Sequence, residues 1–401
     1  MISVEAARGR IVGSMSPTGA ETVGLSEAWS RVLAEDVVAR LTQPPADMSA
    51  MDGYAVGPCA GAVGDVLRLV GAVAAGHPFE GTVGPGEAVR IFTGGVLPPG
   101  AVSILLQEDA TVTDAEVRIG EALVPGRHIR RAGQDFRAGA RLLAAGRRLG
   151  AREIGLAAAA NHAWLAVHRR PVVAILASGD EIFMPGDAIS PGGIVSSNSH
   201  ALAAMVRAVG GHPVMLPIVR DDAGAIAEAV SGAARYDLLV TSGGASVGDH
   251  DLVRPGMERG GFELDFWRIA MRPGKPLMFG RLADTPVLGL PGNPVSALVC
   301  AILFMLPAVA RLSGLPGEAP ATLPARLAAP LPANDHRADF LRCTFTSNAE
   351  GALSARAFST QDSAQLRLLA EADGLILRPP HAPPAAEGDT VRVIRLADIG
   401  V

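Results

Sequence analysis

Lysine, aromatic residues and an excess of positive charge are all scarce in this chain of 401 residues. Lys275 is the only lysine among 35 basic residues, aromatic residues make up 4%, and the formal net charge is -5. Nucleic-acid-binding domains need a basic surface for the phosphates, and many add aromatic side chains that stack on bases. The composition therefore argues against a nucleic-acid partner.

Cysteine is also scarce, with only Cys59, Cys300 and Cys343, which lie far apart in the chain. An odd number of widely spaced cysteines fits a reducing compartment better than a disulfide framework. No Cys/His spacing typical of a zinc site occurs. The first residues contain charges and no apolar segment of a signal peptide, so we expect a cytoplasmic protein.

Long apolar runs are missing as well. The longest, residues 295–310, is too short to span a bilayer and contains Pro307, so we interpret it as a buried helix and expect no membrane partner. Hydrophobic residues make up 49% of the chain and charged residues 19%, which is enough for a large core and excludes a disordered protein.

The lone Lys275 is itself informative. Arginine can replace lysine wherever only the positive charge matters. A lysine that remains therefore suggests a site that needs a compact ammonium group and not a planar guanidinium. Chance survival of one lysine is the alternative.

The length predicts two to four domains at about 150 residues each. Helical spacing of Leu25, Ala28, Val32 and Leu33 predicts a helical segment over residues 1–40 with Ser3 as its cap, and residues 133–161 also look helical and are expected to pack against it. Short apolar runs separated by Gly and Pro predict an inserted β-rich module, with strands at 66–69, 88–92, 103–106 and 116–119.

From residue 171 onwards, strands alternate with helices, which predicts a three-layer, mostly parallel α/β domain. The expected strands are 172–177, 213–218, 238–241 and 287–290, and the expected helices are 199–209, 223–233 and the segment from 295. A Pro/Ala-rich linker then leads to short strands at 340–346, 353–357, 375–377 and 391–394. We therefore predict four units: 1–40 plus 133–168 (helical, elongated), 41–132 (inserted β-rich), 169–314 (α/β) and 315–401 (C-terminal β).

Three loops follow strands of the predicted α/β domain directly, and ligands bind at the carboxyl ends of parallel strands. They are Ser178-Gly179-Asp180-Glu181, the Gly-rich segment from Thr241 to Asp251, and Pro291-Gly292-Asn293-Pro294-Val295-Ser296. We expect all three to meet at one edge of the sheet.

The Gly-rich loop is the most telling of the three. Its small residues let backbone N–H groups approach an anion, while Asp249 and Asp251 at its end would repel a phosphate unless a divalent cation lies between them. The alternative is an ordinary turn with a capping Asp. The Pro291–Pro294 turn taken alone is also a common helix entry. No Walker A pattern is present, which excludes nucleotide hydrolysis of the P-loop type.

Arg268, Arg272 and Lys275 lie within eight residues of each other, a grouping that suits an oxyanion, although a solvated edge is the alternative. Asp52, Thr93 and Asp135 are weaker candidates, because local sequence is equally consistent with turn and cap residues.

The ordered set of motifs closely resembles one family, the molybdopterin molybdenumtransferases of the bacterial MoeA type, also found as the C-terminal domain of gephyrin. The resemblance extends over nearly the whole chain, and the Gly243–Asp251 and Pro291–Ser296 elements also occur in related pterin adenylyltransferases. The matching residues are Pro44-Pro45, Ser49 to Ala55, Thr93-Gly94-Gly95 with Pro98, Arg130 to Asp135, Ser178 to Glu181, Arg220-Asp221-Asp222, Gly243 to Asp251, Arg272 to Pro276 and Pro291 to Ser296.

The resemblance implies a four-domain homodimer that converts adenylyl-molybdopterin and molybdate into molybdenum cofactor and AMP with Mg²⁺. It also implies transient contact with the adenylyltransferase and with molybdoenzyme chaperones. The implied pterin- and phosphate-binding residues are Gly243, Gly244, Ser246, Pro291, Gly292, Asn293, Pro294 and Ser296. The implied metal or catalytic carboxylates are Glu181, Asp221 and Asp251, the oxyanion ligands are Arg268, Arg272 and Lys275, and Asp52, Thr93 and Asp135 would act across the dimer interface.

The chain departs from the family pattern at several positions. Arg268 and Arg272 replace lysine, Met48 replaces Asn, and Ser196 replaces Asp. Gln361-Asp362-Ser363 replaces the usual Gln-Gly-Ser, which weakens any role of the last domain in handling finished cofactor. A pterin-binding scaffold without turnover and a related adenylyltransferase are the rival hypotheses, and the sequence does not distinguish molybdate from tungstate.

Overall fold

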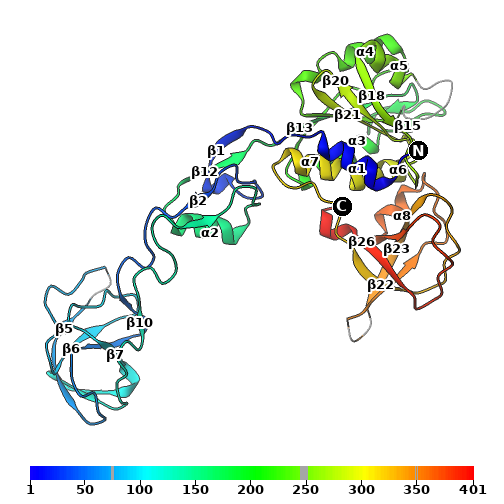
Figure 1. Ribbon diagram of the computed structural model, residues 1–401. Coiled ribbons are helices and arrows are strands. Elements are labelled where there is room, and N and C mark those ends of the chain that lie inside the picture. The colour runs from blue at the N-terminus through cyan, green and yellow to red at the C-terminus, as the bar shows by residue number, and fades with distance from the viewer. Residues whose placement is uncertain (74–75, 244–251, 348, 350) are drawn as a thin grey trace.

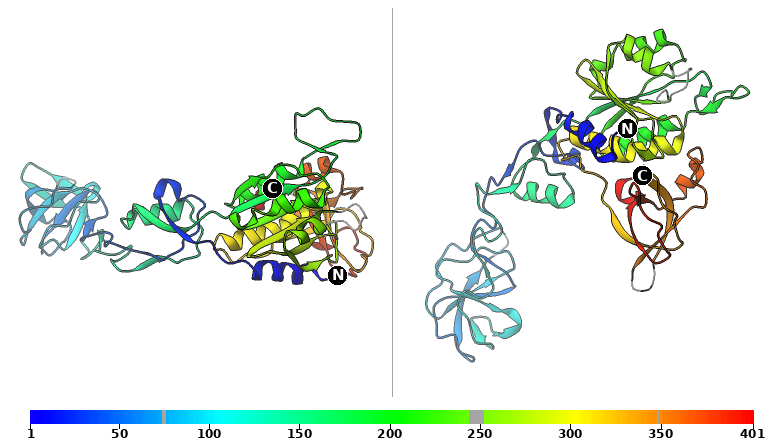
Figure 2. Two further views of the ribbon diagram at one scale, coloured as in Figure 1. Left: turned by 90° about the horizontal axis from the view of Figure 1, so that it is seen from above. Right: turned by 45° about the vertical axis from the view of Figure 1, so that its right-hand side comes forward.

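The computed structural model describes residues 1–401 except 74–75, 244–251, 348 and 350. The chain is elongated: a body carries both termini, and an arm of two smaller units extends away from it (Figure 1). Seen from above, the β-rich module is the far end of the arm (Figure 2). Any site that uses both the arm tip and the body has to span this length.

The body contains a six-stranded sheet in the order β16-β13-β17-β21-β20-β18. Neighbouring pairs are parallel from β16 to β21, whereas β20 is antiparallel to both β21 and β18. The apolar runs of the central strands are buried on both faces, as expected for parallel strands under helical layers. The strands are β13 (Val172–Ala177), β16 (His212–Met215), β17 (Leu238–Ser242), β18 (Phe262–Trp267), β20 (Met278–Leu282) and β21 (Thr285–Leu290).

Helices cover both faces of this sheet and give the predicted three layers. One face packs against α1 (Val4–Gly13), α3 (Asn198–Ala208) and a long helix described below. The other face packs against α4 (Ala223–Val230) and α5 (Val253–Arg259). The 3-10 turn η3 (Ala233–Arg235) precedes β17. The α/β architecture predicted from the alternating pattern is confirmed.

The apolar run near residue 300 forms one continuous helix of 19 residues, Pro294–Leu312. It consists of α6 (Pro294–Cys300), a π-helical segment η4 (Ala301–Met305) and α7 (Leu306–Leu312). Pro307 lacks a backbone N–H, and the π turn just before it accommodates the missing bond. By length and hydropathy this helix could cross a membrane, so the prediction that it is too short is wrong. Its apolar window is 89% buried, which confirms that it is a core helix.

The first helix differs from its predicted place. Ser3 caps α1 as expected, accepting from the backbone N–H of Ala6. However, Val4, Ala7 and Ile11 belong to the core around the long helix, in the body. The prediction that the first helix packs against the segment after residue 133 is therefore wrong.

The middle unit of the arm has fewer helices than its sequence periodicity indicated. It contains strand pairs β1 (Ala20–Gly24) with β12 (Trp164–His168) and β2 (Val37–Val38) with β11 (Arg141–Leu143), and one helix, α2 (Ala151–Ala159). The predicted helix around residues 25–33 is only the turn η1 (Leu25–Glu27). Ser30 has φ 61°, and Val32 and Leu33 form isolated bridges to Arg148 and Val167. Helix over 133–150 is also wrong: Gly133, Gly139 and Gly146 adopt positive φ, which makes turns.

The tip of the arm is the predicted β-rich module, with sheet order β7-β4-β6-β5-β9-β8. All four strands expected from the sequence are present. A short pair, β3 (Met48–Ser49) with β10 (Ile129–Arg130), joins the module to the middle unit. The remaining elements are β4 (Gly53–Val56), β5 (Val66–Ala72), β6 (Glu87–Ile91), β7 (Ser103–Leu106), η2 (Gln107–Asp109), β8 (Ala110–Val112) and β9 (Glu116–Ile119).

The C-terminal unit is a closed β-barrel, since β23 pairs with both β24 and β25. A sixth strand, β19 (Met271–Arg272), comes from the α/β domain and pairs in parallel with the start of β23. The barrel is therefore joined to the segment that leads to Lys275. Its elements are β22 (Leu323–Leu327), β23 (Ala338–Ser347), β24 (Leu353–Ala357), α8 (Leu366–Ala370), β25 (Gly374–Arg378), β26 (Thr390–Arg395) and η5 (Leu396–Ile399).

Candidate active site at the carboxyl edge of the parallel sheet

The three loops singled out in the sequence leave the sheet at the same edge. Ala177 at the end of β13 lies opposite Ser242, and Ser242 lies opposite Leu290 at the end of β21. The loops that begin at Ser178, Gly243 and Pro291 are consequently adjacent. The expected convergence is confirmed for their described residues.

The Gly243 and Gly292 turns are in close contact. The Gly243 N–H donates to the Leu290 carbonyl at 3.2 Å, and Gly243 has φ 95°, a conformation that favours glycine. A Cβ on Gly292 would lie 3.7 Å from the Gly243 Cα. Asn198 ties the two turns together, because its Nδ2 donates to Ser242 Oγ at 2.9 Å and to the Gly292 carbonyl at 2.8 Å. Gly244, Ser246 and Asp251 of the predicted site lie outside the described residues.

The long helix begins at this edge of the sheet and has no side-chain cap. Asn293 occupies the N-cap position, but its side chain makes no capping hydrogen bond. Pro294 is the first helical residue, and the Ser296 that follows is buried. Pro294 has no N–H and the Val295 N–H donates to the Ser363 carbonyl, so the Ser296 N–H and the helix dipole remain to favour a bound anion.

The predicted carboxylates Glu181 and Asp221 lie close together. The pKa of Asp221 is raised, first by burial and then by the negative charges of Glu181 and Asp180; a hydrogen bond from the Asp180 backbone N–H opposes the rise. The described part of the chain holds no group of three or more His, Cys, Asp or Glu side chains arranged to bind a metal. The third proposed ligand, Asp251, is outside that part. Repulsion among the acidic groups is nevertheless what a bound cation would relieve.

Lys275 lies in a loop that packs on the long helix. Gly274 precedes it with φ 110°, and a Cβ there would come within 2.4 Å of Cys300 Sγ, so only glycine fits. The Lys275 side chain is exposed, and no hydrogen bond or ion pair joins its ammonium to any other described residue. An ammonium in this position is available for a ligand.

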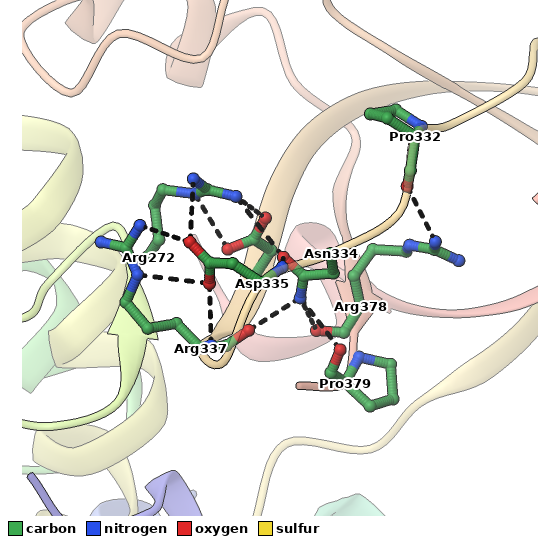
Figure 3. A network of polar contacts seen from close by, with 8 residues as sticks. Arg272, Pro332, Asn334, Asp335, Arg337, Arg378 and Pro379 are labelled. Atoms are coloured by element: carbon green, nitrogen blue, oxygen red, sulfur yellow. Dashed lines mark hydrogen bonds and ion pairs between the residues drawn. The ribbon is translucent and has the colours of Figure 1, made fainter. Parts of the chain in front are cut away.

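The other two cations of the predicted cluster are directed elsewhere. The Arg268 guanidinium stacks on the Trp267 ring at 4.2 Å. Arg272 pairs with the barrel: its Nε donates to Asp339 Oδ1 at 3.0 Å, its Nη2 bonds the second oxygen, and its Nη1 lies 3.7 Å from Asp335 (Figure 3). Asp339 is buried, and these contacts raise the pKa of Arg272. The oxyanion-binding roles of Arg268 and Arg272 stay predictions, and the structure shows Arg272 in an interdomain ion pair.

A barrel loop reaches the Pro291–Pro294 turn, which the sequence did not indicate. Asn293 Nδ2 donates to Ser363 Oγ at 2.9 Å, and the Val295 N–H donates to the Ser363 carbonyl at 3.0 Å. Arg342, only 1% exposed, holds this loop: its side chain donates to the carbonyls of residues 360, 362 and 365 and to the Gln361 side chain. The only sequence signal for this contact was the Gln361-Asp362-Ser363 motif, which differs from the family's usual Gln-Gly-Ser.

The arm carries the remaining predicted residues. Asp52 Oδ1 accepts from the Thr93 backbone N–H at 2.6 Å and from the Thr93 hydroxyl at 2.7 Å. These bonds, the backbone one first, lower the pKa of Asp52, which is therefore an ionised acceptor. Asp135 lies exposed in the loop after β10. Within one chain these residues are far from the sheet edge of the body (Figure 1).

Comparisons with known proteins give matches along nearly the whole chain. Family models match as the MoeA N-terminal region (domains I and II) over residues 2–161, a probable molybdopterin-binding domain over 174–311, and the MoeA C-terminal region (domain IV) over 324–396. Molybdopterin molybdenumtransferase 2 of Mycobacterium tuberculosis is 37% identical over 93% of this chain and 94% of its own. The molybdopterin molybdenumtransferase of Haemophilus influenzae is 30% identical over 98% of both chains.

The chain belongs to the molybdopterin molybdenumtransferase family. A crystal structure of the molybdopterin biosynthesis MoeA protein from Pyrococcus horikoshii shares the fold with a TM-score of 0.84 and 30% identity, over 98% of this chain and 99% of that one. The resemblance stated from the sequence motifs is therefore confirmed. The MoeA-type layout places the sheet edge, the Lys275 loop and the barrel loop in one body.

The raised pKa of Asp221 gives a test of the acidic pair. A carboxylate whose pKa is raised on folding is destabilising when ionised, and this cost is present above the raised pKa and vanishes as the pH falls through it. Without divalent metal, Asp221→Asn should therefore melt at a higher temperature than the wild type at neutral pH, and the difference should shrink on acidification. Thermal unfolding across a pH series measures this, and Asp222→Ala, which removes the side chain that caps α4, is the control expected to be destabilising. An Asp221→Asn variant that is less stable at neutral pH would contradict the assignment.

Proposed function

We propose that this chain transfers molybdenum from molybdate to adenylylated molybdopterin, giving molybdenum cofactor and AMP. Family membership supports the molybdenumtransferase activity, and the adenylylated form of the substrate is our inference. The observation that carries the proposal is the meeting of two tight glycine turns, an uncapped helix start, an acidic pair and an exposed lysine in one body.

The turns would hold the anionic part of the substrate. The Gly243 N–H is already bonded to Leu290, so the N–H groups of Gly244 and Ser246, which lie outside the described residues, and of Ser296 in the helix that begins at Pro294 would supply positive potential without a bulky side chain. Asn198 bonds both Ser242 and Gly292 and so fixes the spacing of the two turns where they leave the sheet. Pro291 and Asn293 give the second turn its rigid shape.

Lys275 would bind the oxyanion. A compact ammonium can approach tetrahedral molybdate from many directions, which a planar guanidinium cannot do equally well. The ammonium would then stabilise charge that develops on the leaving phosphate or on the oxyanion.

Glu181, Asp221 and Asp251 would hold Mg²⁺. These are hard oxygen ligands of the kind that Mg²⁺ prefers, and the mutual repulsion at Asp221 fits a cation at this place. A bound Mg²⁺ would neutralise phosphate charge and polarise the phosphorus–oxygen bond that breaks. The carboxylates themselves position the ion, and one of them is available to accept a proton from water.

The arm would act on a second copy of the chain. Asp52, Thr93 and Asp135 lie far from the sheet edge of their own body, so we propose a cytoplasmic homodimer in which the arm of one protomer reaches the body of its partner (Figure 1). Transient contacts with an adenylyltransferase and with molybdoenzyme chaperones belong to the same proposal.

The deciding experiment follows AMP release from adenylyl-molybdopterin and Mg²⁺, with and without molybdate. Release that depends on molybdate supports the transferase, and replacing molybdate by tungstate tests oxyanion preference. Tight binding without release would instead support a pterin-binding scaffold of the same fold. Formation of adenylyl-molybdopterin from ATP and molybdopterin would support an adenylyltransferase, a function for which the long arm has no evident use.

A further inference from the structure

The α/β domain has a groove that none of the roles above uses. It lies beyond the ends of β13 and β16, beside an excursion with the short strands β14 (Ile182–Phe183) and β15 (Ile194–Val195). The excursion projects from the domain (Figure 2). The groove volume is about 580 Å³, within the range of small-molecule sites.

The walls of the groove are apolar and include two polarisable methionine side chains. Phe183 and Met184 line one side, and Met215, Leu216 and Ile218 line the other. Met184 and Met215 are 40% and 42% exposed, so both side chains can be reached by a ligand in the groove. Thioethers and an aromatic ring are favourable partners for a planar π system.

The groove is already formed. A Cβ on Gly193 would lie 2.5 Å from the Phe183 ring, so the backbone of the excursion packs closely on that ring and holds it in place. Asp187 accepts from the Met184 backbone N–H at 3.1 Å, which closes the turn that carries Met184. A ligand would therefore pay little ordering cost on entry.

Three charged side chains, Asp180, Asp187 and Arg220, line the groove beside these apolar walls, and Asp187 already accepts from the Met184 backbone N–H. Asp180 offers carboxylate oxygens that can accept from ring amino groups, and Arg220 has no hydrogen bond or ion pair to another described side chain. An acceptor and a planar cation at an apolar slot match an amino-substituted nitrogen heterocycle, which has N–H donors, ring acceptors and a π face.

The groove is continuous with the proposed active site. Gly179 lines it, and the Gly179 N–H donates to the Val219 carbonyl at 3.1 Å, while the next residue, Asp180, donates its backbone N–H to Asp221. The loop Ser178–Glu181 thus forms one wall of the groove and one side of the anion-binding edge. A ligand with a phosphate at the turns can extend a ring into the groove.

We propose that this groove binds one planar nitrogen heterocycle of the adenylylated pterin, with Met184, Met215 and Phe183 against its faces and Asp180 on its amino edge. This proposal rests on the proposed function for the identity of the ligand. Adenine and pterin are both amino-substituted nitrogen heterocycles. The experiment below distinguishes which of the two rings the groove binds.

The test uses methyl-labelled methionine in the full-length protein, followed by NMR. AMP carries the adenine ring, 6-carboxypterin carries the pterin ring, and inorganic phosphate carries neither. A ring stacked in the groove should shift the methyl signals of Met184 and Met215 more than those of the other nine of the eleven methionines. Shifts with AMP alone assign adenine to the groove, shifts with 6-carboxypterin alone assign pterin, and shifts with neither overturn the proposal.

A matched pair of variants separates this proposal from the proposed function. Met215→Glu places a carboxylate in the groove, whereas Ile194→Glu makes the same change on the excursion at a position 55% exposed and outside the groove. Met215→Glu should raise the KM for adenylyl-molybdopterin about tenfold with little change in kcat, as expected for loss of uniform binding. Ile194→Glu should leave KM unchanged. Equal KM values in an active enzyme would overturn the groove alone, and absence of AMP release from the wild type would overturn the proposed function alone.

Discussion

Lys275→Ala should lower the rate of molybdate-dependent AMP release by about 10²- to 10³-fold, the usual cost of removing one charge-stabilising group from an active site. The fold should be unaffected, because the side chain is exposed and has no hydrogen bond or ion pair with another described residue. Steady-state kinetics and a melting curve measure the two effects. Lys275→Arg, which keeps the charge but not the compact ammonium, should recover only part of the activity.

Mixed dimers make this prediction sharper. Consider a dimer in which one protomer carries Lys275→Ala and the other carries Asp52→Ala. If each arm serves the partner's body, one active site has both substitutions and the other has neither. If the arm acts on the partner, such purified heterodimers should have about half of the wild-type activity, because two-fold symmetry leaves one site complete. Heterodimers as inactive as either parent would show that Asp52 acts within its own protomer. Unchanged kinetics of Lys275→Ala would remove Lys275 from the site altogether.

The sequence predicted the α/β body well because its signals are local. Each central strand is a short apolar run, and the pleated sheet buries both of its faces, so composition alone identifies it. The rule that ligands bind at the carboxyl ends of such strands then placed the turns at Ser178, Gly243 and Pro291 together, and the strand register confirms this.

The middle unit of the arm was predicted poorly for the opposite reason. Leu25, Ala28 and Leu33 have helical spacing, yet Ala28 and Leu33 reach one small core through turns and bridges rather than through a helix. Periodicity reports which residues are buried, and in a unit this small several backbone paths bury the same residues.

Contacts between units were not predictable from the sequence. Arg268, Arg272 and Lys275 are neighbours in the chain, but β19 turns Arg272 towards Asp339 of the barrel while Arg268 stacks on Trp267. The Ser363 contact with Asn293 joins residues seventy positions apart. Proximity in sequence therefore gave no sign of the ion pair that Arg272 makes with the barrel or of the barrel loop, and the oxyanion-binding roles of Arg268 and Arg272 stay predictions.

Arg342→Met should be the most destabilising single change in the barrel. The buried guanidinium donates to three backbone carbonyls of the loop that carries Ser363, and methionine cannot make these charge-assisted hydrogen bonds. We expect a loss of about 3 kcal/mol in the unfolding free energy of the barrel, since a hydrogen bond to a charged group contributes about 1.5–3 kcal/mol and water can replace part of this at the exposed carbonyls. Arg356→Met on β24 changes an exposed arginine of the same barrel and should cost less than about 0.5 kcal/mol.

Hydrogen exchange of the loop amides distinguishes this local effect from general unfolding. In Arg342→Met, amides of residues 358–366 should exchange faster, and so should the Val295 amide that donates to the Ser363 carbonyl. The start of the long helix would then lose its barrel contact, and the KM for adenylyl-molybdopterin should rise even where the barrel remains folded. Protection equal to that of Arg356→Met would show that Arg342 does not hold the loop, and would separate the barrel from the active site.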